Sequence, residues 1–208
     1  MECVRCCVFA ECPRCDTPTA DGVCSHHPGA PVLWRAKPCD YADYAEVVAH
    51  GLPLYVPWPV GDWTLVDLGY AIDDGRAVAA YLTATRLSDV DGDVEVSIVS
   101  EEPLVGLGAR IAGLPHADPG PSLGVGPALL HLDLDAHRVP LWSVGAADLS
   151  EPLLTEVLVG EWQGRWLWIV VHPATALLSL GAEFELADAA QFGPEALDLP
   201  FGGSGRDW

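Results

Sequence analysis

The chain has little positive charge. Its 208 residues include one lysine, Lys37, and nine arginines against 30 acidic residues, for a formal charge of −20. Such a surface repels phosphate backbones and anionic lipid at long range. We therefore expect neither nucleic acid nor a membrane as a partner, whereas a basic protein partner is compatible with the charge.

The chain also lacks a long apolar run. The stretch from Trp166 to Val171 is far shorter than the roughly 20 residues that a membrane-spanning helix needs. Glu2, Arg5 and Glu11 interrupt the start, where a secretory signal would be apolar. We therefore predict a cytoplasmic location. Because half of the residues are hydrophobic, the chain is able to bury one sizeable core.

Cysteine is absent after residue 39. All seven cysteines lie before that point, at positions 3, 6, 7, 12, 15, 24 and 39. A disulfide-stabilised secreted fold would spread its cysteines through the chain. The clustering therefore indicates a local task near the start.

Four of the residues in this region have the spacing of a metal site. Cys12-Pro-Arg-Cys15 is followed, after eight residues, by Cys24-Ser-His-His27. Two residues between ligands let both side chains of a tight turn face one ion, and three cysteines with one histidine are a common structural zinc set. About 25 residues with few apolar side chains need such an ion, which supplies on the order of 10 kcal/mol. We predict that Cys12, Cys15, Cys24 and His27 hold one structural Zn²⁺, with no position open for catalysis.

Other ligand sets stay open at this point. A second C-x₂-C, formed by Cys3 and Cys6, can combine with the pair at 12–15 in place of the later pair. His26 can replace His27 as the fourth ligand. The pair at 12–15 could also act in redox chemistry, although no βαβ pattern surrounds it.

Short extended segments dominate the rest of the chain. The strongest hairpin is formed by Glu156 to Trp162, the turn Gln163-Gly164, and Arg165 to His172, whose second strand is apolar on both faces and therefore central. Further strands are expected at 63–72, 78–86, 94–98, 130–134, 139–144 and from Leu178 to Leu186, and short helices at 41–50 and 104–112. Sequential strands joined by short turns pair antiparallel.

The predicted organisation has four parts. Residues 1–11 form an N-terminal extension, residues 12–38 a zinc-ribbon-like module, residues 39–200 the main domain and residues 201–208 a flexible tail. The fold class is mainly β or α+β: a zinc ribbon followed by a mostly antiparallel β domain with one or two short helices.

Several motifs occur together in a specific order. After the C-P-x-C…C-x-x-H pattern these are Pro57 to Pro59, Gly106 to Arg110, Asp118 to Pro121, Pro140 to Trp142 and Trp166 to Trp168. Over about residues 12 to 190 the chain resembles a family of uncharacterised, zinc-ribbon-headed proteins from high-GC Gram-positive bacteria. The resemblance implies the pair Cys24/His27 over Cys3/Cys6, because the earlier cysteines precede the usual start of the family. It brings no established activity that can be carried over to this chain.

The segment Gly106-Leu-Gly-Ala-Arg110 is the main candidate for a ligand site. Glycines at a helix start let an anion approach backbone N–H groups, and an arginine adds charge. The spacing is not that of a P-loop or a dinucleotide fingerprint. The simpler interpretation is a helix packed tightly on the sheet, with Arg110 paired to Glu101 or Glu102. The ligand-binding alternative uses Gly106, Gly108, Arg110 and Asp118.

Two further patterns have simpler explanations. His131, Asp133 and Asp135 share one strand face with His137 beyond, which suits a metal but more often marks a solvated face. Asp89, Asp91 and Asp93 lack the downstream spacing of a calcium loop, so a hairpin turn explains them better. No nucleophile motif accompanies the histidines. We therefore expect a non-enzymatic protein-interaction module, the alternative being an enzyme or small-molecule binder with an anionic-ligand cleft near Gly106–Arg110.

Overall fold

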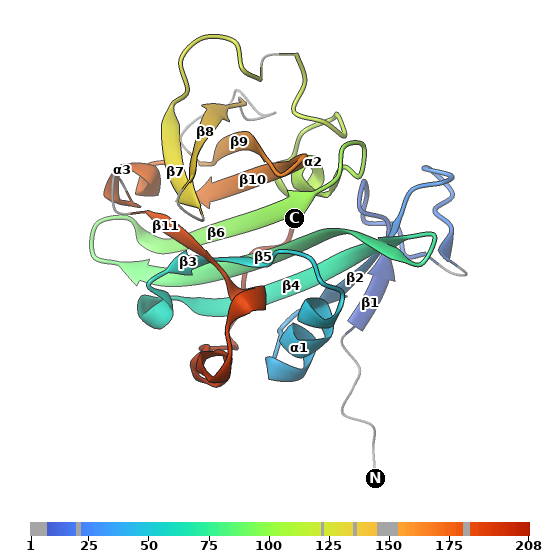
Figure 1. Ribbon diagram of the computed structural model, residues 1–208, viewed down its shortest axis with the longest axis horizontal. Helices are drawn as coiled ribbons and strands as arrows, with labels where there is room; N and C mark the ends of the chain where they lie inside the picture. Colours follow the sequence, from blue (N-terminus) through green and yellow to red (C-terminus); the bar gives the residue numbers. More distant parts are fainter. Residues whose placement is uncertain (1–7, 20–21, 122, 135–136, 145–153, 181–183) are drawn as a thin grey trace.

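The computed structural model describes residues 8–19, 22–121, 123–134, 137–144, 154–180 and 184–208. A curved sheet of nine strands forms the body, and every strand pairing in it is antiparallel (Figure 1). In sheet order its strands are β1 (Val8–Glu11), β2 (Val32–Ala36), β4 (Thr64–Asp73), β5 (Arg76–Ser88), β6 (Gly92–Glu101), β10 (Arg165–His172), β9 (Glu156–Trp162), β8 (His137–Ser143) and β7 (Leu130–Leu134). The predicted mainly antiparallel β fold is confirmed.

The other elements are short. A second sheet contains β3 (Tyr55–Trp58) and β11 (Glu185–Asp188). The helices are α1 (Tyr41–Ala49), α2 (Leu107–Ile111) and α3 (Ala176–Leu180), with 3-10 turns at Val60–Asp62, Ala189–Gln191 and Pro194–Asp198. The expected helices at 41–50 and 104–112 correspond to α1 and α2.

Apolar rows across neighbouring strands give the large sheet two buried faces. On the inner face, Leu68, Leu82 and Ile98 lie opposite one another, and β3, β11, α1 and α3 complete the core there. On the outer face, Tyr81, Val99 and Trp168 lie opposite one another, and α2 covers them. The small sheet crosses in front of the large one in Figure 1. The functional groups described below lie on the outer face.

The strongest predicted hairpin is confirmed. β9 and β10 pair in register around Gln163-Gly164, and β10 also pairs with β6, so β10 is central. The last predicted strand was too long at its start. Ala176 and Leu180, four residues apart, are buried while Leu178 is 85% exposed, which is the period of a helix. Only β11 is extended, and residues 181–183 lie outside the described part.

Both ends of the described chain contact the main sheet. β1 and β2 pair with each other, and β2 pairs with β4, so the cysteine-rich segment is a long connection within the main sheet. Pro31 and Pro38 lie on either side of β2. Because proline has no N–H group, their position outside the strand leaves every residue of β2 able to donate to a neighbouring strand. Phe201 bridges to Leu65 and packs against the inner core, whereas Trp208 packs against the outer core.

Candidate metal centre

The first pair of cysteines lies on a tight turn at the end of β1. The N–H of Arg14 donates to Sγ of Cys12 at 3.5 Å, and the N–H of Cys15 donates to the carbonyl of Cys12 at 3.4 Å. The chain then folds back, because the N–H of Thr19 donates to the carbonyl of Ala10 at 3.0 Å. This turn directs Cys12 and Cys15 to the same side.

The second pair repeats the arrangement. The N–H of His26 donates to Sγ of Cys24 at 3.4 Å, and Ala30 donates to the carbonyl of His27 at 3.0 Å. The backbone turn therefore holds Cys24 in place and brings His27 to the same side of the turn. We call residues 12–19 and 22–30 the metal head.

The four predicted ligands converge. One donor atom from each of Cys12, Cys15, Cys24 and His27 lies within 4.8 Å of all the others. Two sulfurs, of Cys15 and Cys24, are 3.6 Å apart, and Nδ1 of His27 is 3.6 Å from Cys12 and 3.9 Å from Cys24. A tetrahedral zinc ion places two thiolate sulfurs about 3.8 Å apart and a sulfur and a nitrogen about 3.6 Å apart. These three separations are close to those that such an ion requires.

The protein environment treats the thiols differently. Burial raises the pKa of the Cys12 thiol to about 11. Burial also opposes ionisation of Cys15 and Cys24, but hydrogen bonds from Thr17 and from the backbone of His26 outweigh it and lower the pKa of each thiol. Metal binding requires thiolates and releases their protons. The thiols of Cys15 and Cys24 therefore ionise more readily than an ordinary thiol, which favours binding of a cation.

The alternative ligands differ in position. Cys3, Cys6 and Cys7 lie outside the described residues. His26 is exposed and contributes only its backbone N–H. Cys39 is buried in the inner core, where its thiol donates to the carbonyl of Leu65 at 3.4 Å and burial raises its pKa to about 12. Cys39 is therefore separate from the cluster.

Two arginines attach the head to the body. Nε of Arg14 donates to the carbonyl of Val105 at 3.2 Å, and the same guanidinium donates to the carbonyl of Leu104. Nη1 of Arg110 donates to the carbonyl of Cys12 at 2.6 Å. Its other nitrogen lies 3.1 Å from the carboxylate of Glu11. Both attachments come from the loop before α2 or from α2 itself, so this short helix positions the head.

The Gly106–Arg110 segment satisfies its polar groups within the chain. The N–H groups of Leu107 and Gly108 donate to the carboxylate of Glu101 at 2.7 and 3.2 Å. Glu101 is fully buried, and burial raises its pKa to about 8. The acceptor at this helix start is therefore a carboxyl group of the protein, which sequence reasoning had considered only as a partner of Arg110.

The remaining residues of the predicted ligand cleft have packing roles. A side chain at Gly108 would overlap the indole of Trp168, so only glycine lets α2 lie so close to β10. Gly106 has a left-handed backbone, with φ of 87°, at the start of α2. Asp118 accepts from the N–H of Leu104 at 2.8 Å and from Nε1 of Trp166 at 3.0 Å. The geometry favours the packed-helix interpretation, but with Arg110 paired to Glu11 instead of Glu101 or Glu102.

Sequence reasoning missed the residues that attach the head. Glu11 fell within the expected extension, and Arg14 was only a spacer between two ligands. Arg14 and its partner Val105 are 91 positions apart, and Glu11 and its partner Arg110 are 99 positions apart. A weak signal was present in the arginine inside the C-x₂-C turn, since arginine is the residue type most suited to several carbonyl and carboxylate contacts at once.

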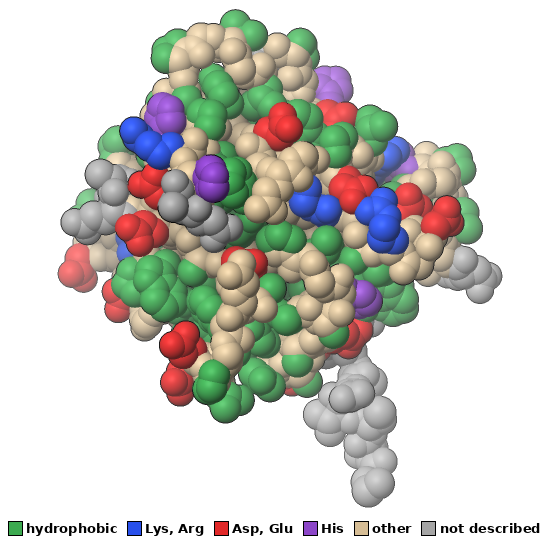
Figure 2. Space-filling model, in the orientation of Figure 1, with side chains coloured by type: hydrophobic (Ala, Val, Ile, Leu, Met, Phe, Trp, Pro, Cys, Tyr) green, Lys and Arg blue, Asp and Glu red, His purple; other side chains and the backbone are tan. Residues whose placement is uncertain are grey.

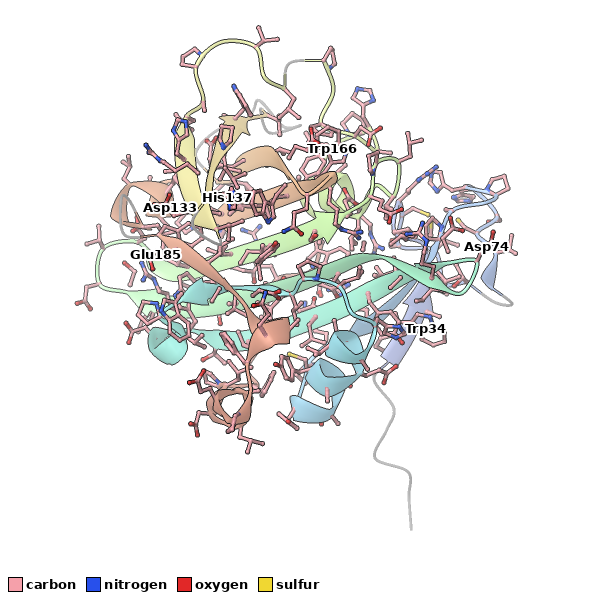
Figure 3. All side chains as sticks on the ribbon, viewed as in Figure 1. Trp34, Asp74, Asp133, His137, Trp166 and Glu185 are labelled. Atoms are coloured by element: carbon pink, nitrogen blue, oxygen red, sulfur yellow. The ribbon has the colours of Figure 1, made fainter. Side chains whose placement is uncertain are left out.

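The other predicted patterns lie at the surface. His131 and Asp133 are exposed on β7 while Leu132 and Leu134 are buried, as expected for a solvated face; Asp135 lies outside the described residues. Figure 3 places Asp133 and His137 on neighbouring strands, away from the metal head. Asp89 and Asp91 lie in the turn between β5 and β6.

Comparisons with known proteins give a family and no activity. Within the described residues, no helix is both long and apolar enough to cross a membrane. Neither a comparison with curated proteins nor one with solved structures gives a match. The family model DUF6758, described as a family of unknown function, matches residues 1–206. The chain therefore belongs to this family of unknown function, DUF6758.

Proposed function

We propose that the protein is a zinc-headed interaction module without catalytic activity, in which one Zn²⁺ held by Cys12, Cys15, Cys24 and His27 fixes a ribbon-like head on the β body. The observation that carries this proposal is the convergence of the four donor atoms within 4.8 Å. Zinc is favoured because sulfur-rich tetrahedral sites select it over hard cations.

The closed donor set supports a structural role for the ion. Catalytic zinc sites keep one position for water or substrate, whereas structural sites fill all four positions with side chains. Cys12 and Cys24 are buried, and the carbonyl next to the cluster is engaged by Arg110. The head would then act as a fixed recognition element.

The charge of the chain supports a basic partner. Most of the described arginines are engaged within the protein, through Asp67, Glu11, Glu102 or backbone carbonyls. The carboxylates in excess remain at the surface, and Figure 2 shows them scattered over the face in view. A field of this kind steers a cationic partner toward the protein without one concentrated patch. The reduced thiol cluster and the motif series favour the cytoplasm of a high-GC Gram-positive bacterium.

Zinc content tests the metal part of the proposal. Protein purified without oxygen is expected to contain one zinc per chain by elemental analysis. Cys24→Ser and His27→Ala should lose most of it. Cys39→Ser is the matched control, because this buried thiol lies outside the cluster and keeps its hydrogen-bond donor. Wild-type protein without stoichiometric zinc, or a Cys24→Ser variant that keeps it, would refute the site.

Partner capture tests the interaction part. Zinc-loaded protein should recover a stoichiometric basic protein from native lysate at low salt, and less of it as ionic strength rises. The Cys24→Ser variant should recover less at every salt concentration. A zinc-loaded protein that recovers no such partner would contradict the interaction role while leaving the metal site intact.

A further inference from the structure

Residues 201–208 begin at Phe201, which packs against the inner core, and end at Trp208, which packs against the outer core. The start of this segment is fixed to β4, where the N–H of Leu65 donates to the carbonyl of Pro200 at 2.7 Å and Gly202 donates to the carbonyl of Leu65 at 3.0 Å. Gly202 and Gly203 then have φ of 119° and 83°, values that favour glycine. The segment therefore has a fixed base followed by a glycine turn.

The far end is fastened by contacts of a different kind. Nζ of Lys37 donates to the carbonyl of Arg206 at 2.6 Å and to Asp207 at 2.8 Å, and the N–H of Arg206 donates to Glu95 at 2.7 Å. Asp207 is almost fully exposed, so its ion pair adds little. The main attachment of this end is the ring of Trp208.

Two arginines form the seat of Trp208. The guanidinium carbons of Arg35 and Arg110 lie 3.9 and 4.6 Å from the centre of the indole, and the ring of Tyr81 meets it edge-on at 5.5 Å. Such cation–π contacts each stabilise a partly buried ring modestly. The position of Trp208 thus depends on how these two guanidinium groups are held.

The same two guanidinium groups contact the base of the metal head. Arg110 donates to the carbonyl of Cys12, the first metal ligand, and pairs with Glu11 at 3.1 Å. Arg35 lies 3.7 Å from the same oxygen of Glu11 and is anchored on its other side by Asp67 at 2.6 Å. The seat of Trp208 and the metal head therefore share Glu11 and Arg110.

Hollows surround the segment between its two ends. One of about 270 Å³ includes Arg206 and Trp208 in its lining, one of about 620 Å³ includes Gly205, and one of about 380 Å³ includes Gly203. Nε1 of Trp208 is buried without a hydrogen-bond partner among the described residues. The segment thus rests on the sheet at a few points and is not packed on all sides.

We propose that residues 203–208 form a strap that the metal head holds closed, so that loss of the ion releases Trp208 and uncovers the polar outer face around Glu95 and Ser97. The inference rests on the metal site of the proposed function and adds a regulated surface to it. When the ion leaves, Cys12 loses its fixed position, and Arg110 loses the carbonyl that helps to hold its guanidinium group against the indole. The coupling is reciprocal, so the strap must in turn strengthen metal binding.

Zinc affinity measured by competition with a chromophoric chelator tests this coupling. Trp208→Ala is expected to weaken zinc binding roughly fivefold or more. Trp58→Ala is the matched control, since Trp58 lies on β3, contacts Phe192 and is 43% exposed. Its zinc affinity should stay within about twofold of wild type. A wild-type affinity in Trp208→Ala would overturn the strap.

Hydrogen exchange of the strap gives a second, independent readout. Amides of residues 203–208 should exchange faster when zinc is removed from the wild-type protein, whereas strands β5 and β10 should not change. Exchange of the strap that is indifferent to zinc would refute the coupling even if the head binds the ion. A wild-type protein that binds no zinc at all would refute the metal site and the strap together.

Discussion

The metal head and the sheet body are stabilised by opposite means. The body buries large apolar side chains on both faces of the sheet, among them Leu82 and Trp168 at 0% exposure. In the described part of the head, the buried side chains are Cys12, Pro13, Thr19 and Cys24, and its one valine, Val23, is 62% exposed. The head therefore has no apolar core of its own.

The two regions therefore depend on different interactions for their stability. Burial of apolar surface contributes about 25 cal/mol per Å², so the body can fold on its own side chains. The head depends on one ion and on the contacts of Arg14 and Arg110 with the loop 104–105 and with Cys12. Changes to the ion and changes to the core should consequently affect different parts of the molecule.

The largest expected effect is local, at the head. Chelation of the metal, or Cys24→Ser, removes an ion whose binding contributes on the order of 10 kcal/mol in comparable segments. Amides of residues 12–19 and 22–30 should lose protection from hydrogen exchange, while β5, β6 and β10 keep theirs. A head that stays protected without metal would show that the contacts of Arg14 and Arg110 are sufficient to keep it folded. The proposed difference between the head and the body would then be wrong.

Next in size is a change in the body. Trp168→Ala removes a fully buried indole from central strand β10 and should lower the free energy of unfolding by about 3–5 kcal/mol in urea denaturation. Leu87→Ala on β5 is the control, because Leu87 is 80% exposed and its loss should cost under about 0.5 kcal/mol. Both variants should still bind one zinc per chain in native buffer. Loss of zinc in Trp168→Ala would mean that the head and body unfold as one unit.

A smaller effect concerns the border between the two regions. Burial raises the pKa of Glu101 from 4.5 to about 8 in the folded protein. Between these values the folded state keeps a proton that the unfolded state has released, so raising the pH through this range favours unfolding, by up to about 1.4 kcal/mol per pH unit. The free energy of unfolding, measured between about pH 6 and about pH 8, should fall less steeply with pH in Glu101→Gln than in wild type.

Glu102→Gln supplies the control for that slope. Arg76 lowers the pKa of Glu102, so this neighbour stays ionised in both states across the same range. Its variant should keep the wild-type slope. An unchanged slope in Glu101→Gln would show that the carboxylate which caps α2 is ionised throughout, held by the N–H groups of Leu107 and Gly108.

Local chemistry made much of the molecule predictable from sequence. Turn residues such as Gln163-Gly164 and Asp91-Gly92, with alternating apolar positions, located the hairpins, and the spacing of two cysteine pairs located the metal cluster. In each case the determining residues lie within a few positions of one another. Capping of α1 by Asp40 is of the same local kind.

Contacts between distant segments were not predictable in this way. The pairing of β6 with β10 joins residues about 70 positions apart, and it brings α2 beneath the head. The partners of Arg110 and Trp208 follow from that pairing and from no local pattern. Amphipathic alternation shows which face of a strand is buried, but it does not show which strand lies beside it.

The smallest effect is expected for the exposed side chains of β7. This strand belongs to the sheet body, but it carries residue types that also bind metals. His131 and Asp133 alternate with buried leucines, and Asp133 is 71% exposed, 3.9 Å from an equally exposed Arg138. Exposed pairs of this kind contribute little because water screens both charges. The double variant His131→Ala/Asp133→Asn should therefore lower the free energy of unfolding by less than about 0.5 kcal/mol and leave the zinc content at one per chain. The opposite result would be a wild-type protein that takes up a second equivalent of zinc and a double variant that does not. It would show that imidazole and carboxylate groups on an exposed strand also bind zinc, so that metal binding is not confined to the metal head.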